Sequence, residues 1–102
     1  TVKWNKTIGK VAKAHSDDML KRNELTHYSK NGQDPGGRLI NAGYEWATWT
    51  ENVAMGQQNE EEAMKSWLES PGHCANIMNA QVTEVGAGRS GKYWTQLFAA
   101  PK

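Results

Sequence analysis

A chain of 102 residues is long enough for one domain with a single modest core and too short for a second domain. Five Trp, three Tyr and one Phe supply the bulky apolar surface that disordered chains lack. The net charge of +1 argues against a nucleic-acid-binding protein, and no apolar run approaches the about 20 residues that cross a bilayer, which excludes a membrane span within this sequence.

The first half of the chain is predicted to hold two helices. Over residues 7–24, the residues spaced to share one helix face are mostly apolar, namely Ile8, Val11, Ala12, His15 and Met19. Asp34 followed by Pro35 is typical of a helix start, with Asp as the N-cap and Pro at the first helical position. This second helix is predicted to be short, because Gly43 ends it.

The middle of the chain combines an irregular stretch with two further helices. Residues 44–56 show no clean period and are predicted to form an ordered loop anchored by aromatic side chains. Asn59 and Glu62 form a variant capping box. The apolar face of the helix that follows is predicted to be buried and consists of Ala63, Met64, Trp67 and Leu68. After Ser70 and Pro71, residues 72–78 are predicted to add one or two helical turns.

The last third of the chain is β-like. Residues 82–89 and 92–99 read as two strands, and Ser90-Gly91 between them is typical of a hairpin turn. Trp4 is predicted to add a further strand. Helices that come first and a hairpin that comes last indicate an α+β fold, with helices packed against an antiparallel sheet.

The side chains that could carry chemistry are His15, His27, His73, Cys74, Glu51 and Glu69. Imidazole and carboxylate groups are ligands that zinc accepts, although spacing alone does not show that they converge. His15 lies on the apolar helix face, which favours a hydrogen-bonded core histidine. Cys74 is the only cysteine, and it is predicted to be a small buried thiol because adjacent helical side chains do not face each other. Glu51 and His73 also have structural interpretations, as a loop acceptor and as part of a helix start.

Five segments in order resemble the CAP superfamily, which comprises cysteine-rich secretory proteins, antigen 5 and pathogenesis-related proteins. Residues 50–56 (T-E-N-V-A-M-G) resemble its G-E-N-[ILV]-A-x-G signature. Residues 67–78 (W-L-E-S-P-G-H-C-A-N-I-M) resemble the W-x-x-S-P-G-H-R-x-N-I-[LM] box of short, bacterial-type members. The other matches are residues 83–88 (T-E-V-G-A-G), residues 93–98 (Y-W-T-Q-L-F) and residues 14–29, which fit A-H-x-x-D-M…F-x-H-x-S.

The resemblance implies an α-β-α sandwich, in which a small antiparallel sheet lies between helices. It implies a single domain over residues 1–102 that lacks the helix which family members carry before Val2. It also implies a cleft in which two His and two Glu hold a divalent metal, often zinc.

The expected cleft residues are carried over one by one. His27 matches the first family histidine and Glu51 the first family glutamate. His73 is the best replacement for the second histidine, Glu69 is displaced by one position from the second glutamate, and Tyr93 stands where larger members have a histidine. The expected metal ligands are therefore His27 and His73, with Glu51 nearby.

The function implied by the resemblance is that of a secreted, extracellular binding module. Its partner would be a sterol, a lipid or another small hydrophobic ligand, or an extracellular protein, and its cofactor zinc or another divalent metal. The alternative is a zinc-dependent hydrolase or peptidase, in which zinc on His27 and His73 lowers the pKa of a bound water to about 7 and Glu51 acts as general base. A purely structural surface module is a third interpretation.

Overall fold

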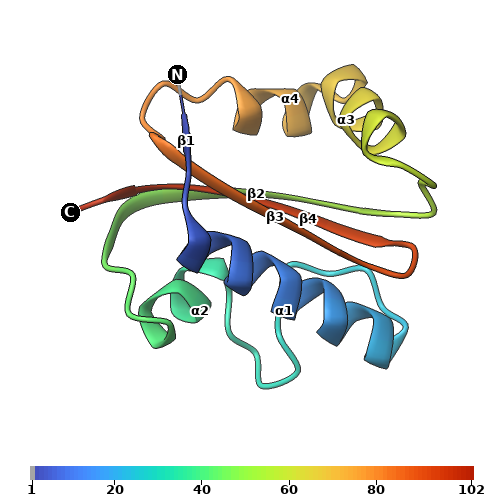
Figure 1. Ribbon diagram of the computed structural model, residues 1–102, viewed down its shortest axis with the longest axis horizontal. Coiled ribbons are helices and arrows are strands. Elements are labelled where there is room, and N and C mark those ends of the chain that lie inside the picture. Colours follow the sequence, from blue (N-terminus) through green and yellow to red (C-terminus); the bar gives the residue numbers. More distant parts are fainter. Residues whose placement is uncertain (1) are drawn as a thin grey trace.

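Three layers make up the fold, with a four-stranded sheet between two pairs of helices (Figure 1). The computed structural model describes residues 2–102. Helices α1 and α2 cover one face of the sheet, and α3 and α4 cover the other. The elements are β1 (Lys3–Trp4), α1 (Lys6–Arg22), α2 (Pro35–Asn41), β2 (Trp46–Met55), α3 (Glu60–Glu69), α4 (Pro71–Ile77), β3 (Glu84–Ser90) and β4 (Tyr93–Pro101). This arrangement confirms the predicted α+β class and the α-β-α sandwich.

The strand order in the sheet is β1-β3-β4-β2. Both β2 and β3 run antiparallel to β4. The short strand predicted at Trp4 is present, but it runs parallel to β3, so the sheet is mixed and not purely antiparallel. Direction could not be predicted for this strand, because a two-residue strand has no pattern of its own.

The predicted helix starts are confirmed by their capping bonds. The Asp34 carboxylate accepts a hydrogen bond from the Gly37 backbone at 2.8 Å. The Asn59 side chain accepts one from the Glu62 backbone at 2.9 Å. The Glu62 carboxylate in turn accepts from the backbone of Gln58, one residue before the cap. Both caps satisfy helix N–H groups that have no partner within the helix.

The prediction of a loop over residues 44–56 is wrong, because most of this stretch is β2, a ten-residue strand. Two features remove the alternation that signals a strand. Helices cover both faces of the sheet at this point, so the side chains of residues 51–54 are all buried although they point alternately to the two faces. The pairing with β4 also shifts register between Trp46 and Thr48, which breaks the period at the start of the strand.

Two smaller expectations at the other elements also need correction. Met64 and Leu68 are exposed, because α3 contacts the sheet only through a narrow stripe that contains Ala63 and Trp67. In the hairpin, Ser90 still pairs with its opposite residue in β4, so the turn consists of Gly91 and Lys92 and not of Ser90-Gly91. Gly91 has a φ of 57°, a conformation that favours glycine at a tight hairpin turn.

Helix α1 packs directly on the backbone of β3. A Cβ atom at Gly86 would lie 2.2 Å from the backbone nitrogen of Gly9, and one at Gly88 would lie 2.3 Å from the Cα of Lys13. The missing side chains therefore let α1 approach the sheet closely. This approach closes the core on that face, which contains Ile8, Val11, Ala12, Leu39, Tyr44, Leu97 and Ala99.

Helix α4 lies along the outer edge of β2, which has a partner strand on only one side. The Asn76 side chain donates to the backbone oxygen of Glu51 at 3.0 Å and to the side chain of Asn52 at 2.9 Å. The Thr50 hydroxyl donates back to the Asn76 carbonyl. These bonds fix α4 to the strand that carries the GEN-like motif.

Candidate functional site

Glu51 is a buried carboxylate in β2, with a side chain that is 0% exposed. Arg38, from α2, donates from Nη1 to Oε2 at 3.2 Å and from Nη2 to Oε1 at 3.3 Å. The same guanidinium donates to the backbone carbonyl of His27. A two-bond contact of this kind holds both partners in a fixed geometry and compensates the buried negative charge.

His27 lies in the segment between α1 and α2 and is the second partner of Glu51. Its Nδ1 is 2.9 Å from Glu51 Oε1. Because an ionised carboxylate can only accept, Nδ1 carries the hydrogen, and Nε2 is the nitrogen that holds the lone pair whenever the ring is neutral. The side chain is 48% exposed. His27 is therefore an imidazole that is oriented by a buried carboxylate and accessible from outside.

His15 lies next to this network and is 1% exposed, which confirms the prediction of a core histidine. Its Nε2 is 2.6 Å from the Thr26 carbonyl, which can only accept, so Nε2 carries the hydrogen. Burial lowers the pKa of His15 below 6.5, and the charge of Arg38 lowers it further, while Glu51 opposes the shift. The ring is therefore neutral, and its Nδ1 is a buried acceptor that no group in residues 2–102 reaches with a hydrogen bond.

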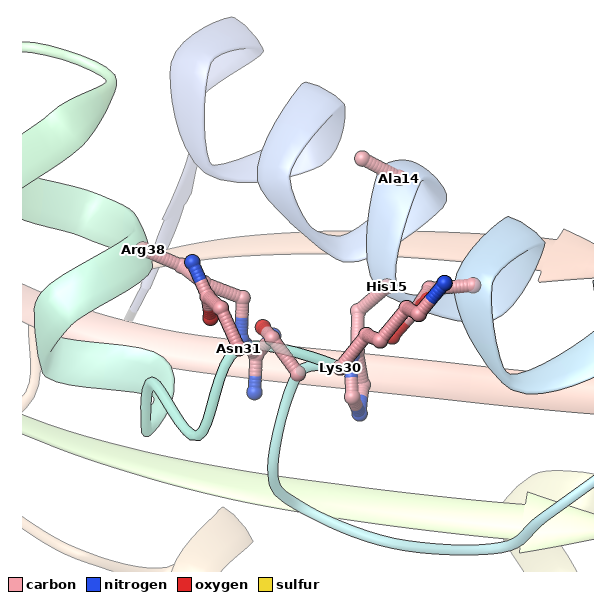
Figure 2. Close-up of a pocket in the computed structure, with 7 residues that line it drawn as sticks. Ala14, His15, Lys30, Asn31 and Arg38 are labelled. Atoms are coloured by element: carbon pink, nitrogen blue, oxygen red, sulfur yellow. The ribbon is translucent and has the colours of Figure 1, made fainter. Parts of the chain in front are cut away.

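An open pocket of about 530 Å³ lies beside these residues, and we call it the α1–α2 pocket (Figure 2). His15 reaches it from α1 and Arg38 from α2, while Lys30 and Asn31 come from the connecting segment. Ala14, Asp18 and Ser29 complete the lining. The pocket thus has polar groups from three separate segments, as small-molecule sites commonly have.

His73 does not join His27 and Glu51. It lies on α4, which covers the opposite face of the sheet (Figure 1). Its Nδ1 is 2.9 Å from the Ser70 hydroxyl, and its backbone carbonyl accepts a hydrogen bond from Asn52. Glu69, at the end of α3, is largely exposed, and its Oε1 lies 4.0 Å from Lys65 Nζ. The structure therefore brings together the first histidine and first glutamate of the expected set and separates the rest.

Tyr93 lies on the same face of the sheet as Glu51, but its side chain is part of the buried core. It is 1% exposed, packs with Met19 and Val53, and donates from its hydroxyl to the Asn23 side chain at 3.1 Å. Cys74, on α4, is only partly buried, so the thiol is less enclosed than predicted.

A second pocket that would suit a hydrophobic ligand lies on the other side of the sheet. A pocket of about 400 Å³ forms between α3 and the sheet, on the face opposite to Glu51. Its apolar lining includes Trp4, Met64, Trp67 and Trp94. The cleft beside His27 and Glu51 and the tryptophan-lined pocket are thus two separate surfaces.

Residues 1–98 match the family described as the cysteine-rich secretory protein family, CAP. The chain belongs to the CAP family. It is 38% identical over 96 residues to the uncharacterized protein YkwD of Bacillus subtilis, covering 92% of this chain and 37% of that protein. The uncharacterized membrane protein YlbC of the same organism is 32% identical over 97 residues, covering 95% of this chain and 28% of that protein. The chain therefore spans about a third of the length of these curated relatives.

Solved structures agree with this assignment. This CAP domain matches an extracellular protein containing an SCP domain from Bacillus anthracis with a TM-score of 0.92 and 33% identity, covering 96% of this chain and 33% of that one. It matches an outer surface protein of Borrelia burgdorferi with a TM-score of 0.91 and 23% identity, covering 99% of this chain and 78% of that one. At that identity, the second match supports the fold alone. Across residues 2–102, no helix of the CAP domain has the length and apolar character to cross a membrane.

The residues of this CAP domain do not fit a zinc ion held by His27, Glu51 and His73. Both oxygens of Glu51 are bonded to Arg38, so a fixed cation already stands beside the carboxylate. His73 is bonded to Ser70 on the far face. Among the described residues, no three His, Cys, Asp or Glu side chains lie close enough together to hold a metal. The donor set offers two neighbouring ligand groups, fewer than the three protein ligands that catalytic zinc sites use.

Sequence reasoning missed Arg38, which lies within the short helix predicted after Asp34. A signal was available, because a glutamate on a strand buried on both faces needs a positive partner. The one charged residue in the seven-residue helix α2 is Arg38.

Replacing His15 with Gln in this CAP domain should reduce the dependence of stability on pH. The folded domain binds a proton at His15 less readily than the unfolded chain does, because the pKa is lowered from 6.5 on folding. Protons therefore favour the unfolded chain, and the free energy of unfolding should fall as the pH drops below about 6.5. Urea unfolding of both proteins at about pH 7.5 and about pH 5.5 measures the difference. An equal loss of stability in both would contradict the assignment of this effect to His15.

Proposed function

We propose that this CAP domain is a binding module of an extracellular or surface protein, and that its ligand binds in the α1–α2 pocket. The location is supported by a structural relative, 33% identical, that is described as an extracellular protein. Because the chain spans about a third of its curated relatives, the proposal concerns the domain and not the activity of a whole protein.

The observation that carries the proposal is that the polar groups of the pocket are fixed before a ligand arrives. Arg38 is held by both oxygens of Glu51 and by the His27 carbonyl. His15 is held by the Thr26 carbonyl at 2.6 Å. Groups that are already ordered lose little conformational entropy on binding, so more of their interaction energy contributes to affinity.

The pocket suits a ligand with both polar and apolar parts, because most of its wall is apolar and several polar groups stand within it. His15, Asp18, Ser29, Lys30, Asn31 and Arg38 all contribute polar or charged groups. A hydrophobic ligand, as the family resemblance suggested, has a second possible site in the tryptophan-lined pocket on the opposite face. The face on which a ligand binds therefore distinguishes the two sites.

Nuclear magnetic resonance titration tests the proposal. The domain labelled with nitrogen-15 is titrated with a library of sugars, organic acids and fatty acids, and we expect saturable shifts around Ala14, Asn31 and Arg38. Ala14 is an exposed alanine in the lining, so Ala14→Trp should block the pocket and abolish these shifts. Ala75→Trp is the matched control, because Ala75 is an exposed helical alanine on α4. Shifts confined to α3 and Trp94 would overturn the choice of site.

A second candidate function is hydrolysis, and the bond between His27 and Glu51 specifically favours it. A buried carboxylate that orients an accessible imidazole is the arrangement that enzymes use for a general base. His27 Nε2 would accept a proton from a water molecule as that water attacks an ester or an amide. In this scheme Glu51 stabilises the imidazolium that forms, and Arg38 holds the carboxylate in place.

Turnover of an ester and peptide library tests this second function. Activity that falls at least a hundredfold in His27→Gln would support it, since general acid–base groups contribute about 10²–10⁴-fold. His73→Gln is the control, because it makes the same change to a histidine that lies on α4, on the opposite face of the sheet, and is bonded to Ser70. Equal activity in wild type and His27→Gln would exclude His27 as the base.

A further inference from the structure

Three side-chain amides form a chain of hydrogen bonds that ends at the tryptophan-lined pocket. Asn76 Nδ2 donates to the Glu51 carbonyl at 3.0 Å and to Asn52 Oδ1 at 2.9 Å. Asn52 Nδ2 donates in turn to the His73 carbonyl at 3.2 Å and to Gln96 Oε1 at 3.0 Å. Because a backbone carbonyl can only accept, the two carbonyls fix which atom of each amide is the nitrogen. The oxygen of Gln96 therefore faces Asn52, and its Nε2 is directed away from that bond.

Gln96 Nε2 is a hydrogen-bond donor without a partner in residues 2–102. The residue is only 7% exposed, and it lines the tryptophan-lined pocket. Unlike His15 Nδ1, Nε2 is not one of the fully enclosed unpaired atoms, so it is accessible from the pocket. A buried donor that lacks a partner is costly, so a ligand that brings an acceptor to this atom is favoured.

The other buried polar side chains around the pocket already have partners. Trp67 Nε1 donates to the Val53 carbonyl at 3.3 Å, and Trp94 Nε1 donates to the Gln57 carbonyl at 2.9 Å. The Thr95 hydroxyl is bonded to a serine of α1 on the other face of the sheet. The two indole rings are thus held in place and offer their apolar surface to a ligand. Over the described residues, Gln96 supplies the one buried side-chain donor that is left for it.

The charges at the pocket balance each other. Arg89 and Glu60 both line it, and both are exposed. The Arg89 guanidinium lies 4.4 Å from the centre of the Trp94 ring, which attracts the cation. With one group of each sign, the pocket favours neither an anion nor a cation. Its volume of about 400 Å³ lies within the range of about 300–1,000 Å³ that is typical of small-molecule sites.

We propose that the tryptophan-lined pocket is a second binding site, for a neutral ring compound that carries one carbonyl group. The ring packs against Trp67 and Trp94, and the carbonyl oxygen accepts a hydrogen bond from Gln96 Nε2. This inference goes beyond the proposed function, because the site lies on the opposite face of the sheet from the α1–α2 pocket and takes a different class of ligand.

Three matched probes test the ligand class by nitrogen-15 nuclear magnetic resonance titration. 1-Tetralone has the ring system and a carbonyl, tetralin has the ring system alone, and tetralin-1-carboxylate carries a charge. We expect saturable binding of tetralone, with tetralin weaker by about tenfold, which corresponds to about one hydrogen bond. The carboxylate should bind more weakly than tetralone, because no unpaired cation compensates the loss of its hydration. Equal affinities for tetralone and tetralin would overturn the role of Gln96, and no binding of any probe would overturn the site.

Gln96→Met removes the donor and keeps a side chain of similar length. Asn52 retains its bond to the His73 carbonyl, so no buried donor loses its last partner. In this variant tetralone should bind no more tightly than tetralin, while the affinity for tetralin stays unchanged and shows that the pocket is intact. The wild type gives an independent measurement, since the side-chain amide signals of Gln96 should move with tetralone and stay in place with tetralin. Unmoved signals in a saturated tetralone complex would contradict the proposed contact.

A blocking variant locates the site. Ala87 is an exposed alanine of β3 in the pocket lining, so Ala87→Trp should abolish the binding of tetralone and tetralin. Ala47→Trp is the matched control, because Ala47 is an exposed alanine of β2 outside this lining. Ala14→Trp, which blocks the α1–α2 pocket, should also leave tetralone binding unchanged. Tetralone binding that survives Ala87→Trp and is lost in Ala14→Trp would place the ligand in the other pocket and overturn this inference.

Discussion

Replacing Arg38 with Met should destabilise the domain by about 3–5 kcal/mol, measured as the free energy of unfolding in urea. The change leaves Glu51, with a side chain that is 0% exposed, without the guanidinium that compensates it. His27 keeps one hydrogen bond to the carboxylate, but its ring is neutral unless it takes up a proton. A buried charge whose partner has been removed retains its full desolvation cost.

The double variant Arg38→Met, Glu51→Met separates the cost of the lone charge from the loss of packing. Apolar residues that replace both members of a buried ion pair are often neutral for stability, so the double variant should recover to within about 1 kcal/mol of the wild type. A double variant as unstable as Arg38→Met alone would show that the pair is needed for packing and not only for charge balance.

Replacing Gly86 with Ala should cost about 3 kcal/mol or more, at the upper end of what overpacking causes. The added Cβ would lie 2.2 Å from the nitrogen of Gly9 and 2.4 Å from the carbonyl carbon of Ile8. Both contacts are with backbone, so no side chain can rotate away and α1 itself has to move. Because Ile8 belongs to the core on that face, the movement would loosen the packing of α1 on the sheet.

Gly72→Ala is the matched control for this prediction. Gly72 lies in α4, and a Cβ there meets no atom within 4 Å. The substitution should leave stability unchanged or raise it slightly, because Ala favours a helix more than Gly does. Similar losses for Gly86→Ala and Gly72→Ala in thermal unfolding would show that the close approach of α1 is not the cause.

The sequence predicts the helices of this domain better than its strands, and the reason lies in the way each element is buried. Helix α1 has one buried face, so its apolar residues recur at helical spacing, and the caps at Asp34 and Asn59 act through local bonds. Strand β2 is buried on both faces over residues 51–54, which removes the alternation that identifies a strand. Its partner β4 lies some forty residues later in the chain, and that pairing leaves no local pattern.

The candidate site could be predicted only in part. Residue-by-residue matching placed His27 and Glu51 correctly beside each other. It could not place His73, because the face of the sheet on which α4 packs depends on the path of the whole chain. It also missed Arg38 and the unpaired acceptor of His15, since both follow from contacts between segments that are distant in sequence.

The hydrogen bonds between α4 and β2 have a further consequence, for the solubility of the domain. An uncovered outer strand exposes a row of backbone donors and acceptors to which a strand of another molecule can add, and β2 would offer ten residues for this. Asn76 occupies one of these acceptors, and the helix that carries it lies along the strand. At the opposite edge, β1 has only two residues and offers little length for pairing. Damage to α4 should therefore appear first as self-association of the folded domain, before any loss of its core.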